Sequence, residues 1–148
     1  NAATNIMIRR VGIDKVNKTL RALGCEKTTL NRLLFDSEAS RRGVKNYITA
    51  REMGAVLEKL WRGEVVSQAA SKAMMDILLD QRLNGKLPFF IDSMGIDIAH
   101  KTGEDDGISH DVGVIYAKEP LVCCFVGEHV DVPMYERLMQ DAARMLCE

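Results

Sequence analysis

Hydrophobic positions divide the chain into two parts with different spacing. Before residue 90, apolar residues recur every three or four positions, which is typical of helices with one buried face. This pattern predicts helices over residues 3–12, 13–24, 49–63 and 67–81. Their expected buried faces contain Ile6, Met7 and Val11; Ile13, Val16, Leu20 and Leu23; Met53, Val56, Leu57 and Leu60; and Ala70, Met74, Ile77 and Leu78.

Residues typical of helix ends support these boundaries. Gly12 and Gly24 follow the first two segments, and Ser67 precedes the fourth as a cap. Thr49, with Glu52 three residues later, forms a capping-box sequence before the third. The stretch 34–48 has no periodicity, and a loop of this length inside a compact domain tends to be functional.

After residue 90 the pattern changes to strands. Alternating residues predict strands over 95–102, 108–116 and 121–127, and "EDDG" between the first two indicates a hairpin. A last helix over 131–148 begins with Asp131 as cap and Pro133 in its first turn, and its apolar face contains Leu138, Ala142 and Met145. We predict an α/β (α+β) fold, with about four helices, a three-stranded antiparallel meander and a C-terminal helix.

Composition excludes several functional classes. The formal net charge of −1 argues against a nucleic-acid binder that depends on a basic surface. No apolar run approaches the roughly 20 residues that span a bilayer, and no signal peptide is visible at the N-terminus. The cysteines lack metal-ligand spacing, so we expect no metal and no cofactor, and we favour buried free thiols over disulfides. Cys123 and Cys124 should point to opposite sheet faces.

The tripeptide Lys101-Thr102-Gly103 ends the first predicted strand. Lysine supplies a charge for a substrate carboxylate, threonine a hydroxyl donor, and glycine room for a ligand beside the backbone. A backbone N–H at the end of this strand could stabilise an oxyanion. The tripeptide alone equally fits a surface strand that leads into a turn. His100 and His110 flank the hairpin, and we expect a cross-strand polar pair rather than a metal site.

The order of these segments resembles the C-terminal part of a class A β-lactamase, in the penicillin-recognising serine hydrolases. That family has the motifs Ser-x-x-Lys, Ser-Asp-Asn and Lys-Thr-Gly. "HKTG", the following "DGISHDVGVIY", the amphipathic last helix, the opening "NAATNIMIRRVG" and "YITAREMGAVLEKLWRGEVVS" carry the resemblance along the whole chain. It implies one partial β-lactamase-like domain over 1–148, with a helical part over 1–90 and the sheet with its last helix over 91–148.

The resemblance implies roles for five residues. Lys101 would help to bind the substrate carboxylate and tune proton transfer, and Thr102 would donate to the same carboxylate. Gly103 would allow close approach, and the backbone N–H of Glu104 would be an oxyanion-hole donor. Asn1 would correspond to the asparagine of Ser-Asp-Asn and contact the amide side chain of the substrate.

Two departures from the family pattern stand out. No serine is followed three residues later by lysine, so the nucleophile is expected upstream of Asn1, together with the first two strands of the sheet. The family's Glu-x-x-Leu-Asn, whose glutamate activates the deacylating water, is also absent from the loop. Glu38 is the only glutamate there, and a solvated charge is favoured over a catalytic base; Asp36 is no better placed.

The resemblance implies a serine hydrolase that attacks a β-lactam or a peptide like the D-Ala-D-Ala peptidoglycan stem through an acyl-enzyme. The chain by itself is expected to be inactive. A non-catalytic penicillin-recognising or protein-interaction module on the same scaffold is the alternative. By the same resemblance we expect a bacterial periplasmic or secreted protein. The strand 121–127 would lack its outer neighbour, which favours a homodimer or strand swap through that edge.

Overall fold

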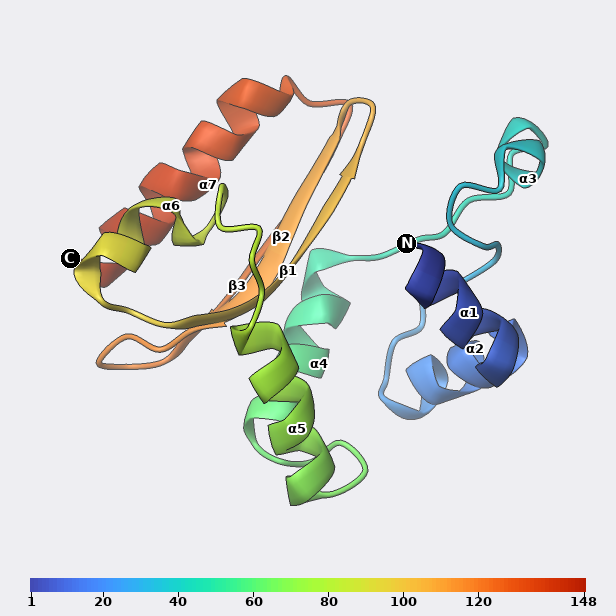
Figure 1. Ribbon diagram of the computed structural model, residues 1–148, viewed down its shortest axis with the longest axis horizontal. Helices are drawn as coiled ribbons and strands as arrows, with labels where there is room; N and C mark the ends of the chain where they lie inside the picture. The colour runs from blue at the N-terminus through green and yellow to red at the C-terminus, as the bar shows by residue number, and fades with distance from the viewer. The chain divides into compact units, whose positions relative to one another are not determined.

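The computed structural model describes residues 1–148 and divides into two compact units, Asn1–Glu52 and Met53–Glu148 (Figure 1). The elements, in order, are α1 (Ala2–Val11), α2 (Ile13–Ala22), α3 (Ser37–Arg41), α4 (Ala50–Trp61), α5 (Gln68–Leu79), α6 (Pro88–Ile91), the 3-10 turn η1 (Asp92–Met94), β1 (Ile98–Asp105), β2 (Ile108–Ile115), β3 (Leu121–Glu128) and α7 (Val132–Cys147). This confirms the predicted mixture of helices with one antiparallel sheet. None of the helices has the length and apolarity that crossing a membrane requires.

The first unit contains α1, α2 and a closed loop. Gly12 separates the two helices with φ of 90°, a value that side chains disfavour. Thr29 and Tyr47 form two backbone hydrogen bonds of 2.9 Å with each other, which join the two ends of the loop. Most of the predicted loop 34–48 therefore lies between the two residues of this bridge. It contains the short helix α3, whose cap Asp36 accepts a hydrogen bond from the N–H of Ala39.

The capping box before α4 forms only in part. The Thr49 hydroxyl accepts the N–H of Glu52 at 3.2 Å, as its spacing predicts. The Glu52 carboxylate, however, accepts the N–H groups of Glu26, Lys27 and Thr28, together with the Thr28 hydroxyl. The hydroxyl of Thr28 and the N–H of Lys27 lower the pKa of Glu52 from 4.5 to about 2. Glu52 therefore fixes the turn that follows α2.

The second unit is built on the sheet, whose strand order is β1-β2-β3. Both pairs are antiparallel, and Gly107 turns the first hairpin with φ of 64°. α6 and α7 lie on one side of the sheet (Figure 1). The core between them consists of Leu87, Ile91, Ile98, Ile115, Cys123 and Ala143.

The adjacent cysteines of β3 point to opposite faces, as strand geometry predicts. Cys123 is part of the core beneath α7. Cys124 lies on the other face, where a β-carbon at Gly54 of α4 would be 3.6 Å from its sulfur. Burial raises the pKa of Cys123 and raises that of Cys124 to about 11. Cys123, Cys124 and Cys147 are free thiols.

The buried faces predicted from the sequence are wrong for three helices. In α1, Ile8 is buried, whereas Ile6, Met7 and Val11 are exposed. In α5, Ser71 and Met75 are buried and Ile77 is 73% exposed. In α7, Met139 and Ala143 are buried, whereas Leu138 and Met145 are 53% and 76% exposed. In α5 and α7, the small Ser71 and Ala143 lie on the packed face, so ranking positions by side-chain hydrophobicity shifted the predicted face.

Candidate active site

The Lys-Thr-Gly tripeptide lies on β1, a strand at the edge of the sheet. Its register places Lys101 opposite Val112, Thr102 opposite Asp111 and Gly103 opposite His110. Because side chains alternate along a strand, Lys101 and Gly103 share one face and Thr102 lies on the other. Lys101 is exposed, and its Nζ donates to the carbonyl of Thr102 at 2.6 Å. Thr102 is 9% exposed.

The peptide between Gly103 and Glu104 has a defined orientation. Nζ of Lys86 lies 3.3 Å from the carbonyl oxygen of Gly103 and 3.3 Å from that of His110. One ammonium can contact both oxygens only if each carbonyl points between the paired strands. In a planar trans peptide, C=O and N–H point in opposite directions. The N–H of Glu104 therefore points to the free edge of β1, where an external acceptor can reach it.

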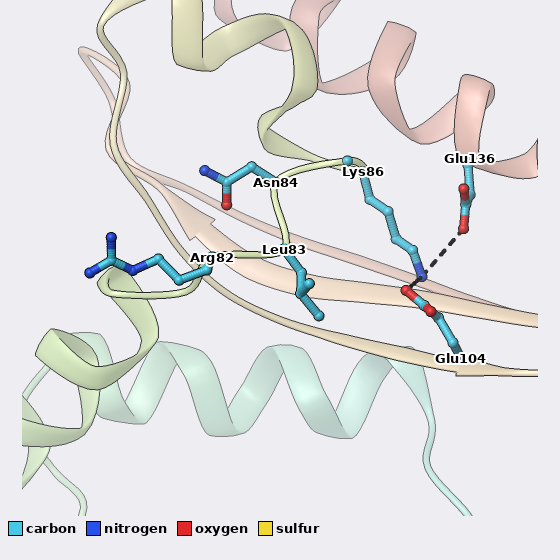
Figure 2. A pocket seen from close by; sticks show the side chains of 7 residues that line it. Arg82, Leu83, Asn84, Lys86, Glu104 and Glu136 are labelled. Carbon is cyan, nitrogen blue, oxygen red and sulfur yellow. Dashed lines mark ion pairs between the residues drawn. The ribbon is translucent and has the colours of Figure 1, made fainter. Parts of the chain in front are cut away.

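Lys86 was not predicted as a site residue. It lies just before α6, is 4% exposed, and reaches between β1 and α7 (Figure 2). Besides the two carbonyls, its Nζ contacts Oε1 of Glu104 at 3.2 Å and Oε1 of Glu136 at 3.4 Å. These residues line an open pocket of about 400 Å³. The only sequence signal was a lysine directly before the apolar "LPFF", which by itself does not indicate burial.

The expected cross-strand pair of histidines does not form. His100 and His110 stand opposite Gly113 and Gly103, so they point to different faces. Nδ1 of His100 lies 2.9 Å from Oδ1 of Asp111, and both side chains are buried. The N–H of Leu87 donates to the same carboxylate at 3.1 Å, while Nε2 of His100 is buried without a partner. This polar cluster joins β1, β2 and the start of α6.

His110 lies on the opposite face of the sheet. Its Nδ1 accepts the N–H of Gly127 at 3.1 Å. Burial, opposed by a backbone hydrogen bond at Ser109, lowers the pKa of His110. His110 therefore links β2 to β3 and has no counterpart across the hairpin.

The other two predicted site residues, Asn1 and Glu38, lie in the first unit. Asn1 is exposed at the start of α1, and its side chain makes no capping hydrogen bond. The side-chain amide of Asn5, which was not a predicted site residue, makes two hydrogen bonds to the backbone of Leu34. Its Nδ2 donates to the carbonyl of Leu34 at 2.9 Å, and its Oδ1 accepts the N–H of Leu34 at 2.8 Å. The start of the loop is therefore fixed by an amide on α1.

Glu38 lies in the first turn of α3 and pairs with Arg42 at 2.7 Å. Its side chain is 74% exposed, and this pairing is a local contact between residues four apart. Asp36 is engaged as the cap of the same helix. Within its unit the loop presents no buried carboxylate, in contrast to the buried Asp111 of β2.

Comparisons with known proteins agree with one another. The model of the "Beta-lactamase enzyme family" matches residues 1–148. No curated protein matched the sequence. The β-lactamase from Sphaerobacter thermophilus DSM 20745 is 26% identical, with a TM-score of 0.84 over 97% of this chain and 56% of that one.

Two further structures share the fold. The L158E mutant of PBP-A, described as an acyl-enzyme complex with penicillin G, is 25% identical with a TM-score of 0.83, over 99% of this chain and 55% of that one. A class A β-lactamase representative from Bacteroides cellulosilyticus DSM 14838 is 19% identical with a TM-score of 0.76, over 96% and 56%. The chain thus spans little more than half the length of the structures it matches.

Proposed function

Because the chain belongs to the β-lactamase enzyme family, we propose that it is the C-terminal portion of a serine hydrolase that acts on β-lactams or D-Ala-D-Ala-like peptides. The serine would be supplied by a segment upstream of Asn1, since no Ser-x-x-Lys occurs in the chain. Its oxygen would form an ester with the substrate carbonyl while the amide C–N bond breaks and the nitrogen takes up a proton.

Lys101 and the edge of β1 carry the binding chemistry in this proposal. The exposed ammonium would attract the substrate carboxylate, and the backbone of Gly103 would allow the acyl chain to approach along the edge of the strand. The outward N–H of Glu104 would donate to the developing oxyanion, an interaction that typically contributes 10²–10³-fold to rate. Thr102 lies on the face away from Lys101 and is 9% exposed, so its hydroxyl would reach the carboxylate from the edge of β1. Asn1 would contact the amide side chain of the substrate.

The match of the family model to residues 1–148 is the observation that carries the proposal. The test is intact-mass analysis of the full-length protein that contains this chain, after incubation with benzylpenicillin. We expect one acyl group per molecule, attached to an upstream serine. Reversible binding without a mass increase would favour the alternative, a non-catalytic penicillin-recognising module.

We further propose that the acyl-enzyme is released slowly. Hydrolysis requires a positioned base and water, and a general base typically contributes 10²–10⁴-fold. Glu38 is paired with Arg42 at the surface and is not held for that task. Stopped-flow kinetics with a chromogenic cephalosporin should therefore give a burst followed by slow turnover. Rapid turnover without a burst would contradict slow release.

The chain alone should form no covalent adduct with penicillin. It contains no nucleophile activated by a lysine three residues away, so its mass should not change. An adduct on Ser93 or Ser109 would show that the assignment of the nucleophile is wrong.

We also propose that residues 121–127 of β3 pair with another segment. β3 has one neighbour in the sheet, and Val122 is 41% exposed on it. An unpaired apolar edge recruits a further strand, either from an upstream segment or from a second copy. The chain alone should form dimers in light scattering, and a stable monomer at high concentration would argue against this pairing.

A further inference from the structure

We propose that Lys86 is a positioning residue for the oxyanion-binding peptide. Lys86 is not part of the Lys-Thr-Gly motif, and it lies 17 residues before Gly103 in the sequence. The inference rests on the proposed function, because it assigns a role within the same acylation step. Its basis is one buried ammonium that contacts the carbonyl oxygen of Gly103 and reaches toward Glu104 and Glu136 (Figure 2).

Lys86 holds this peptide at two points. Its Nζ contacts the carbonyl oxygen of Gly103 at 3.3 Å and the Glu104 carboxylate at 3.2 Å. The first contact adds to the pairing of Gly103 with His110 in fixing the plane of the peptide whose N–H points to the free edge. The second contact restrains Glu104, the residue that carries this N–H. β1 has no neighbouring strand on its outer side to hold the same peptide. Beyond the pairing with β2, Lys86 adds a restraint from the face of the sheet.

The positive charge of Lys86 also favours binding of an oxyanion by the N–H of Glu104. A cation beside a carbonyl oxygen polarises the peptide, and a polarised peptide is a stronger N–H donor. The same ammonium also offsets two carboxylates, Glu104 and Glu136, that border the pocket. Without it, two negative charges would lie near a site at which an oxyanion must form, and like charges there oppose the transition state.

The lysine is held in place by its surroundings. It is 4% exposed, and the adjacent Leu87 and Pro88 are buried. Glu136, on α7, also accepts the hydroxyl of Ser109 on β2 at 2.9 Å. α7 and β2 therefore fix one acceptor of the lysine, β1 supplies two others and the His110 carbonyl of β2 is the fourth. A buried ammonium with four acceptors is restrained in a way that a surface lysine is not.

The test substitutes Lys86→Met, which keeps the length of the side chain and removes its charge. In the full-length protein we expect the acylation rate constant for benzylpenicillin to fall about 10–100-fold, by analogy with loss of an oxyanion-hole donor. The dissociation constant of the preceding non-covalent complex should change less than about threefold. Infrared difference spectra should show the acyl-enzyme ester carbonyl at higher frequency, because its hydrogen bond is weaker.

Three variants serve as controls. Lys86→Arg retains the cation and should restore acylation to within about threefold. Arg82→Met removes an exposed cation that lines the same pocket and pairs with Asp80, and it should leave acylation and the carbonyl band unchanged. Glu136→Gln keeps a neutral oxygen acceptor for Lys86 and its contacts with β1, and it should slow acylation far less than Lys86→Met does. If Lys86→Met does not fold, Lys86→Gln takes its place and should shift the band in the same direction.

A measurement without substrate separates this inference from the proposed function. The residual dipolar coupling of the Glu104 N–H bond reports its orientation in the unreacted protein. We expect it to change in Lys86→Met and to be retained in Lys86→Arg and Arg82→Met. If the wild-type protein is never acylated, the proposed function fails, and this coupling still decides whether Lys86 positions the peptide. An unchanged coupling, or an unchanged carbonyl band in an acylated Lys86→Met protein, overturns the inference.

Discussion

The loop of the first unit and the β1–β2 ladder of the second hold their polar groups in different ways. The loop is tied by hydrogen bonds to its backbone, namely the Thr29–Tyr47 bridge, the Asn5 amide on Leu34 and the Arg32 guanidinium on the carbonyl of Val44, and its glutamate Glu38 is solvent-exposed. The ladder holds charged groups in place, with Asp111 buried against His100. In the proposed reaction, the ladder serves acylation and the loop would serve deacylation.

This difference suggests that the two chemical steps are separable in this protein. Preorganised donors and charges stabilise a transition state because they need no reorganisation during the reaction. The ladder has such groups, and the loop has none that is both charged and buried. We therefore expect substitutions in the ladder to affect folding and acylation, whereas substitutions in the loop should alter its local order with little effect on chemistry.

The largest effect is expected for Asp111→Ala. It removes the acceptor of both the His100 imidazole and the N–H of Leu87, and these groups are buried. Leaving them without a partner should cost about 3–5 kcal/mol of unfolding free energy. Urea denaturation of the full-length protein measures this loss. Asp76→Ala, which breaks an exposed pair with Lys72, is the control and should cost less than about 0.5 kcal/mol.

A smaller and local effect is expected for Asn5→Ala. Both backbone groups of Leu34 lose their partner on α1, which should cost about 1–2 kcal/mol because the site is only partly buried. Hydrogen exchange should increase at residues 33–36 and stay unchanged in β2. Asn84→Ala, at an exposed position, should leave both regions unchanged. Equal loss of protection in the loop and in β2 would contradict the separation of the two regions.

Local signals in the sequence were sufficient for most of the fold. The meander, the Asp131 cap and the Lys-Thr-Gly strand follow from neighbours that are close in the chain. The His100–Asp111 pair could also have been found, because a two-residue turn at 106–107 places Thr102 opposite Asp111. The same register places His100 and His110 on opposite faces, which excludes the predicted histidine pair.

The groups that the sequence did not reveal have distant partners. Asn5 binds a residue 29 positions away, and Lys86 contacts carbonyls 17 and 24 positions away. No periodicity or capping rule links such pairs, since tertiary packing alone brings them together. Glu52 illustrates the same limit: a capping box was predicted correctly at its N–H, but its carboxylate binds a turn 24 to 26 residues earlier.

Glu52 provides a pH test of the first unit, because its carboxylate accepts hydrogen bonds from three backbone N–H groups and from the Thr28 hydroxyl. Its pKa is lowered from 4.5 to about 2, so its contribution to stability is fully present above about pH 4.5 and is lost as the pH falls toward 2. The stability difference between wild type and Glu52→Gln should therefore shrink over that interval. Thermal unfolding from pH 7 to pH 2 measures it, and a difference independent of pH would contradict the assignment.

The smallest effect is expected for Glu38→Gln, which tests the loop directly. The carboxylate is 74% exposed and paired only with Arg42 of the same helix, so its loss should cost at most about 0.5 kcal/mol. If deacylation does not use Glu38, steady-state turnover of a chromogenic cephalosporin should stay within about twofold of wild type. Lys101→Ala should instead slow the burst, because it removes a charge on the acylation side. A large loss of turnover in Glu38→Gln with an intact burst would identify Glu38 as the deacylation base and remove the contrast between loop and ladder.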